Sequence, residues 1–294
     1  MLTLFTHTKK FEGHSGLIQR NAIRAWTQLR PRPEIIIFGE DDVEGVAREL
    51  GVTAGPRVAR NAHGTPLVSD LYAKAQQLSS APILCYSNAD IILFNDLLAA
   101  IDRVRDRRPL LLAGRRCELD VRQPLDVSQA GWDARLRDEA ARRGVVKWHG
   151  AIDYFVFTSG LFADIPPLAI GRWHFDNALL YLARTRGAIL IDASPAVLAI
   201  HQNHDYGYHP KGMQWIHQGP ESSENMEMAG GWRNMYTLAE STHILAPNGL
   251  RPNLHPLRLQ RALERVPVIG ALFRFGARVA RKLASLAQPR PAAS

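Results

Sequence analysis

Apolar and polar positions form two alternating patterns along the first 200 residues of the chain. Short runs of consecutive apolar residues are typical of buried strands, and apolar residues that recur every three or four positions are typical of helices facing a core. Strands are expected over residues 2–6, 34–38, 82–86, 110–113, 152–157 and 188–192. Strands that alternate with helices predict an α/β fold with a mostly parallel central sheet and helices on both faces.

Residues that start and stop helices set the expected helical segments. These cover residues 15–29, 42–50, 66–79, 95–104, 130–143 and 176–186, with caps at Ser15, Asp41 or Asp42, Thr65 and Asn95. Residues 114–150 are polar and weakly periodic, which indicates an insertion. Residues 201–255 show little regular pattern but are rich in His, Asn and aromatic residues, so a functional loop is expected there.

Composition narrows the class of protein. Apolar residues make up 46% of the chain and charged residues 22%, which excludes a mostly disordered chain. No apolar run reaches about 18 residues and the first residues lack a basic start, so neither a membrane span nor a secretory signal is expected. Cys85 and Cys117 are too few for a disulfide framework or a four-cysteine zinc site, which favours a reducing cytoplasm.

The positive charge lies almost entirely at the C-terminal end. The net charge is +8, and the residues from Pro256 onward carry eight Arg or Lys against one acid, so residues 1–255 hold a net +1. Because residues 1–255 are nearly neutral, we do not expect this part of the chain to bind nucleic acid. We expect a domain over residues 1–250 and a basic tail over 251–294, where Pro267 and Gly270 separate two helices.

The second tail helix, over residues 271–286, has Arg274, Arg278, Arg281 and Lys282 on one face and apolar residues on another. Such a helix is typical of association with an anionic membrane surface. A helix docked on the domain with a solvated basic face is the alternative.

Common nucleotide and hydrolase motifs are absent. The chain has no G-x-G-x-x-G, P-loop, H-E-x-x-H, G-x-S-x-G or C-x-x-C sequence. Function must therefore be sought among acids and histidines at strand ends, where ligands bind in open α/β sheets.

The most informative strand end is the run from Leu84 to Leu93, in which Asn88 and Asp90 interrupt apolar residues. In an extended chain both side chains lie on one side, where their oxygens suit Mg²⁺ or Mn²⁺. An ordinary turn is the alternative.

The segment S-N-A-D-I-I-L resembles the D-x-D region of GT-A-type glycosyltransferases, with Asn88 in place of the first acid. The resemblance covers about residues 1–245 in order of elements and implies a Rossmann-like domain that binds a nucleotide-sugar with Mn²⁺ or Mg²⁺. It implies that the first β-α unit, which includes Thr6, holds the nucleotide and that Glu40 contacts the nucleoside. Favourable charge at a helix start is the alternative for Glu40, Asp41 and Asp42.

Two later segments fit the same resemblance. Asp176 stands at a helix start, where an acid of inverting GT-A enzymes deprotonates the acceptor hydroxyl; simple capping is the alternative. His201 and His204, with His209 just beyond, supply the remaining metal ligand or contact the diphosphate. Zinc is disfavoured because no cysteine is near and the site is expected to be rich in oxygen.

These observations predict a metal-dependent, inverting glycosyltransferase that moves a sugar from a nucleotide-sugar donor to a hydroxyl, as in polysaccharide biosynthesis. The acceptor, a glycan, lipid-linked sugar or protein, stays open, and a cytoplasmic or peripheral membrane location is expected. A nucleotidyltransferase on sugar phosphates is the nearest alternative, although the glycine-rich loop that follows its first strand is replaced here by residues 7–10. A non-catalytic nucleotide- or carbohydrate-binding protein, favoured by Asn88, and a membrane-surface adaptor are the others.

Overall fold

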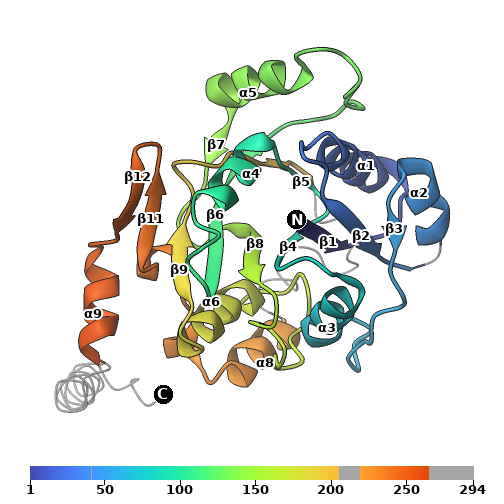
Figure 1. Cartoon of the computed structure of the whole chain (residues 1–294). Coiled ribbons are helices and arrows are strands. Elements are labelled where there is room, and N and C mark those ends of the chain that lie inside the picture. Colours follow the sequence, from blue (N-terminus) through green and yellow to red (C-terminus); the bar gives the residue numbers. More distant parts are fainter. Residues whose placement is uncertain (41, 205–218, 265–294) are drawn as a thin grey trace, which may run out of the picture. The chain divides into compact units, whose positions relative to one another are not determined.

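The computed structural model describes residues 1–40, 42–204 and 219–264 (Figure 1). Residues up to Pro252 form one compact unit, and those from Asn253 belong to a second, of which α9 (Pro256–Glu264) is described. Asp41, His209 and the helix expected over 271–286 lie outside the described residues. Within the described ranges, no helix is long and apolar enough to cross a membrane.

A mixed sheet runs through the first unit (Figure 1). Its spatial order is β12 (Gly249–Pro252), β11 (His243–Ala246), β9 (Ile189–Asp192), β6 (Leu110–Leu119), β8 (Ile152–Thr158), β4 (Ile83–Ser87), β1 (Leu2–His7), β2 (Glu34–Phe38) and β3 (Thr53–Ala54). Neighbours are parallel except that β12 is antiparallel to β11 and β8 is antiparallel to β6 and β4. The predicted mostly parallel sheet is confirmed.

The C-terminal half of β6 also belongs to a smaller branch of the sheet. There β10 (Ala199–Gln202) pairs in parallel with β6, and β5 (Ile91–Ile92) pairs antiparallel with β10. On β6 itself, β7 (Val145–Val146) pairs antiparallel. The branch brings the chain after β4 beside the chain after β10, which are more than 100 residues apart in sequence.

Helices cover both faces of the sheet, as predicted. On one face lie α1 (Gly13–Thr27), α2 (Val43–Leu50) and α4 (Asn95–Asp102), packed over a buried cluster that includes Leu4 and Trp26. On the other lie α3 (Val68–Leu78) and α6 (Phe175–Thr185), over a cluster that includes Phe5. Adjacent residues of β1 enter opposite clusters because successive side chains of a strand point to opposite faces. A third cluster packs beneath α5 (Trp132–Arg143).

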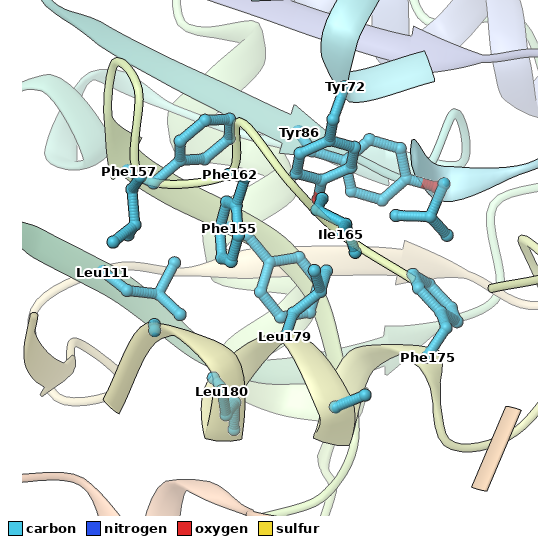
Figure 2. Close-up of a cluster of buried hydrophobic side chains, with 14 of the residues drawn as sticks. Tyr72, Tyr86, Leu111, Phe155, Phe157, Phe162, Ile165, Phe175, Leu179 and Leu180 are labelled. Atoms are coloured by element: carbon cyan, nitrogen blue, oxygen red, sulfur yellow. The ribbon is translucent and has the colours of Figure 1, made fainter. Parts of the chain in front are cut away.

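Aromatic rings fill the core between the sheet and the helices α3 and α6 (Figure 2). Tyr72 of α3 stacks on Phe157, with ring centroids 5.4 Å apart. Phe175, the first residue of α6, meets Tyr86 of β4 edge-on at 6.4 Å. Full burial of a side chain of this size is worth about 1.5–3 kcal/mol, so the packing of Phe175 fixes the start of α6 against β4.

Several expected boundaries are wrong in detail. The first helix begins at Gly13, two residues before Ser15, and α3 begins at Val68 rather than at Pro66. The residues before α3 are held instead by strand-like bridges from Pro66 to Arg60 and from Leu67 to Ala169.

Three other expectations about local structure also change. Asn95 is the first residue of α4, and its side-chain oxygen accepts a hydrogen bond from the backbone N–H of Arg30 instead of capping the helix. The expected insertion begins later, because β6 continues to Leu119. Beyond residue 218 the expected loop contains α8 (Pro220–Met228), β11 and β12.

Candidate metal and acid–base site

The carboxyl ends of the parallel strands gather polar side chains at one edge of the sheet. Because β8 runs antiparallel to its neighbours, its first residues reach the same edge. Ligands of open α/β sheets bind at this edge. The residues that lie at this edge are His7 at the end of β1, Glu40 after β2, Asn88 and Asp90 after β4, Arg116 and Glu118 on β6, Asp153 on β8, His201 on β10, and His204 just beyond it.

Asp90 and His201 are brought together by the β5–β10 pairing. The chain turns after β4, where the Ile91 N–H donates to the Asn88 carbonyl, and then enters β5 with Ile91 opposite His201. The buried side chain of Gln202 donates to the backbone carbonyl of Asp90 at 3.0 Å. Backbone pairing and this amide hold the turn in register, so the Asp90 carboxylate faces the two histidines.

Asp90, His201 and His204 form a compact, largely buried cluster, with one potential ligand atom from each residue within 4.8 Å of the others. Asp90 Oδ2 is 3.1 Å from His204 Nε2 and 3.7 Å from His201 Nε2. Burial acts to raise the pKa of Asp90, but the two histidines and Lys9 together hold it well below its usual range. Burial lowers the pKa of His201, which keeps its imidazole neutral, the form that ligates metals.

The donor atoms of this cluster fit a divalent cation. Asp90 Oδ1 and His201 Nδ1 are both buried and have no hydrogen-bond partner among the described residues. An unpaired buried carboxylate oxygen is costly, and a cation bound to Asp90 would satisfy it. The set of two imidazoles and one carboxylate contains more nitrogen than the oxygen-rich site expected from the sequence. Nitrogen ligands are accepted by first-row transition metals such as Mn²⁺, whereas Mg²⁺ prefers oxygen ligands.

Asn88 does not join this cluster, because its amide is used elsewhere. Its Oδ1 accepts from the Tyr86 hydroxyl at 2.9 Å, and its Nδ2 donates to Asp153 Oδ1 at 2.9 Å. Residues 88–90 form a turn, so Asn88 and Asp90 do not lie on one side as in an extended chain. The expectation that both residues share one metal ion is therefore not met by the geometry.

A second polar network lies beside the first and was not anticipated. Arg116 donates to Asp153 Oδ2 at 2.9 Å and to Glu118 at 3.0 Å, and Lys147 pairs with Glu118 at 3.1 Å. Both carboxylate oxygens of Asp153 are thus occupied. One signal in the sequence was available, since Asp153 interrupts the apolar run of β8. Arg116 gave none, because its segment was expected to be an insertion.

Asp176 lies on the first turn of α6, two residues after His174 and close enough to the second network to sense it. Burial raises the pKa of Asp176 to about 7, with the Asp153 carboxylate adding to the rise and Arg116 opposing it. In the described chain, Asp176 Oδ1 accepts a hydrogen bond from the backbone N–H of the next residue, Asn177. His174, not Asp176, occupies the capping position of α6, so the capping alternative does not describe Asp176.

The residues expected to hold the nucleotide differ in their accessibility. Thr6 is completely buried within β1, and its hydroxyl has no partner among the described residues. The next residue, His7, stands at the strand end, where burial and the nearby Arg60 lower its pKa to about 4. Glu40 is exposed and paired with Arg60. Glu40 and Arg60 therefore form an exposed ion pair at the ends of β1 and β2, and the half-buried His7 lies at the end of β1.

Comparisons with known proteins give matches at the level of structure. No family model and no curated protein sequence matches the chain. A mannosyltransferase of Pyrobaculum calidifontis, in complex with GDP-Man and Mn²⁺, is 14% identical, with 71% of this chain and 58% of that one covered and a TM-score of 0.43. TarS of S. aureus, in complex with UDP-GlcNAc, is 11% identical over 78% and 65% of the two chains, with a TM-score of 0.48.

A glucose-1-phosphate thymidylyltransferase from Bacillus anthracis, described as putative, is 9% identical over 79% of this chain and all of that one, with a TM-score of 0.42. The matched part of this chain thus spans less than two thirds of the first two proteins. The glycosyltransferase resemblance seen in the sequence recurs among solved structures, and a nucleotidyltransferase stands beside it. At these sequence identities and TM-scores, the similarity to these structures does not by itself establish a function for this chain.

Proposed function

We propose that the chain is a glycosyltransferase that transfers a sugar from a nucleoside-diphosphate sugar to an acceptor hydroxyl. The observation that carries the proposal is the pair of neighbouring sites at one sheet edge. One is a buried Asp-His-His cluster suited to a divalent cation, and the other is a carboxyl group, Asp176, whose pKa is raised to about 7. In sugar transfer from a diphosphate, a cation can stabilise the leaving group and a base can activate the nucleophile.

Asp90, His201 and His204 would hold the cation, and Mn²⁺ fits their donor atoms better than Mg²⁺. A bound divalent cation neutralises the negative charge that develops on the departing nucleoside diphosphate. Because these three residues supply the ligands, the amide at Asn88 does not deprive the site of a donor. The main reason to favour a non-catalytic binding protein is thereby removed.

Asp176 would act as the base that accepts the proton of the acceptor hydroxyl. A base with a pKa near the working pH is efficient, because it is largely ionised and still holds a proton well. Inversion is favoured because the other nearby carboxylate, Asp153, has both oxygens engaged by Asn88 and Arg116. A carboxylate held in this way is a poor nucleophile for a covalent sugar intermediate.

The nucleotide would lie across the ends of β1 and β2, with His7, Glu40 and Arg60 around the nucleoside and Lys9 between it and Asp90. The support for Lys9 is its electrostatic coupling to Asp90. Thr6 is completely buried within β1, so it would act on the nucleotide only through the strand that carries His7.

We propose that the basic tail, whose separate unit begins after Pro252, meets an anionic membrane surface. Among the described tail residues, Leu257, Leu259 and Leu263 of α9 are exposed beside Arg258 and Arg261. This combination of apolar and basic residues on a terminal helix supports the proposal.

The test of the site is metal binding measured with the donor product present. Mn²⁺ is titrated into the full-length protein with UDP or GDP, and free Mn²⁺ is followed by electron paramagnetic resonance. We expect one tightly bound ion per chain in the wild type and none in Asp90→Ala. The control Asp102→Ala removes an exposed carboxylate at the end of α4 that pairs with Arg105 rather than facing the cluster, and it should bind Mn²⁺ normally. Equal binding by Asp90→Ala would overturn the assignment.

A further inference from the structure

Three aromatic side chains gather beside the start of α6. Trp173 and His174 end the loop that leads into the helix, and Trp232 lies in the short helix η1 (Trp232–Asn234). The His174 ring stands between the two indoles, with centroids 5.9 Å from Trp173 and 5.7 Å from Trp232. Trp173 is 47% exposed and Trp232 is 70% exposed. We call these three residues the aromatic platform.

Most large rings of the described chain lie in or against the core, and Trp148, Trp173 and Trp232 are the exposed exceptions; of these, Trp173 and Trp232 contact the same His174 ring. Trp26 and the rings of Figure 2 are almost entirely buried. Single apolar side chains in water need no explanation, but a group of rings on one surface marks a place where something binds. Two indoles on either side of an imidazole two residues before the proposed base are such a group.

The platform is built rigidly on the loop side. Asn225 of α8 is completely buried, and its amide donates to the carbonyls of Trp173 and Ala169, each at 3.1 Å. Arg172 donates to Glu221 of α8 at 2.7 Å, with both side chains largely buried. These contacts with helix α8 fix the backbone at Arg172 and Trp173, so the indole of Trp173 stays outside the core.

The other side of the platform is tied to the same helix start. Gly230 and Gly231 have φ of 87° and 95°, conformations that other residues rarely adopt, and they turn the chain so that Trp232 lies by His174. The Asn177 amide donates to the carbonyl of Tyr236 at 2.7 Å, which fastens the segment after Trp232 to the residue after Asp176. Both sides of the platform are thus anchored within one turn of the base.

His174 itself has φ of 80°, in the left-handed region. For a residue with a side chain this conformation costs about 1–3 kcal/mol and persists where surrounding contacts enforce it. The strained backbone places the imidazole between the indoles. A residue in the ordinary helical region would turn the side chain elsewhere.

We propose that the aromatic platform binds the pyranose ring of a carbohydrate acceptor and presents one of its hydroxyls to Asp176. A pyranose has an apolar face of C–H groups that matches a flat ring, and hydroxyls at its rim that match carboxylate and amide groups. The platform offers the flat rings, and Asp176 offers the polar group in the next turn. The proposal rests on the proposed function and names its acceptor class, a sugar rather than a protein side chain.

The test uses the full-length protein with Mn²⁺ and either UDP or GDP, and cellotriose, maltotriose, mannotriose and chitotriose as probes. Saturation-transfer NMR reports saccharide binding from the protons of the sugar itself. We expect at least one trisaccharide to show a saturation-transfer signal, and this signal should be strongest for the C–H protons of one ring face. Trp173→Ala and Trp232→Ala should each weaken its binding at least threefold, while Leu78→Ala, which removes an equally exposed side chain at the far end of α3, should not.

The same samples report nucleotide binding, so the two proposals fail separately. If the nucleotide binds but no trisaccharide shows an NMR saturation-transfer signal, the platform proposal is overturned and the proposed function still stands. Saccharide binding, measured by saturation transfer, that is unchanged in both tryptophan variants would also overturn the platform proposal. Absence of both nucleotide and saccharide binding would contradict the proposed function itself. If Trp173→Ala does not fold, Trp232→Ala, which removes the more exposed ring, decides.

Discussion

Replacing Asp176 with asparagine should remove the proposed base and at the same time stabilise the folded protein. The two side chains have nearly the same shape, and asparagine keeps an oxygen for the N–H of Asn177. It lacks the proton acceptor, so sugar transfer should fall by about 100-fold or more. A purely structural role for Asp176 predicts the opposite pair of results, with stability lost and turnover kept.

The stability gain follows from the raised pKa of Asp176. Burial moves this pKa from 3.8 to about 7, so between these pH values the folded state keeps a proton that the unfolded state has lost. The contribution of Asp176 to the free energy of unfolding of the wild type therefore falls as pH rises from about 4 to 7, by up to about 4 kcal/mol. Asp176→Asn carries no such penalty and should be more stable than the wild type at pH 8 but nearly equal to it at pH 4.

Urea unfolding at pH 5, 6.5 and 8 measures this difference, and Asp133→Asn is the matched control. Asp133 is the second residue of α5, just as Asp176 is the second residue of α6, but it lies away from the site. The control should show no stabilisation that grows with pH. The transfer rate of the wild type should also fall below pH 7, because the carboxylate form is the base. A less stable Asp176→Asn with normal turnover per folded molecule would refute the reasoning.

Three further changes test other parts of the account. Asp90→Ala should lower transfer by about 100-fold or more while leaving the fold intact, as measured by turnover and circular dichroism; activity within about threefold of the wild type would rule out the metal site. Arg172→Met should reduce the free energy of unfolding by about 3–5 kcal/mol, because it leaves the buried Glu221 carboxylate without its ion-pair partner. Arg122→Met, which breaks an exposed ion pair, should cost under about 1 kcal/mol. Equal costs would contradict the interpretation of Arg172 and Glu221 as a buried pair. The full-length protein should co-sediment with anionic liposomes at low salt, less so at high salt, and not after removal of residues 256–294; a protein that stays in the supernatant would make the tail a packing element.

Local patterns were enough to predict the layers of the fold. The run over residues 34–38 is a strand because its β-branched residues fit a sheet buried on both faces, and the structure has β2 at the same bounds. Asp90, His201 and His204 were singled out because polar residues follow apolar strands there. Their meeting depends only on the pairing of β5 with β10, two strands too short to be recognised in sequence.

What could not be predicted depends on contacts between distant segments. Asn88 looked like a metal ligand because its neighbours suggested an extended chain, but Tyr86 and Asp153 take up its amide. Arg116 became part of the site only because β6 extends past a bulge between Ala113 and Arg115. The raised pKa of Asp176 comes from burial and from Asp153 across the sheet, neither of which leaves a mark in the sequence around residue 176.

The central claim, that these two neighbouring sites break a nucleotide-sugar, is tested most directly by nucleotide release. The full-length protein is incubated with Mn²⁺ and a panel of UDP- and GDP-sugars, and free UDP or GDP is measured with and without EDTA. The account predicts slow release from at least one donor, stopped by EDTA and absent in Asp90→Ala. Release that continues unchanged in EDTA and in Asp90→Ala, or no release from any donor, would contradict it.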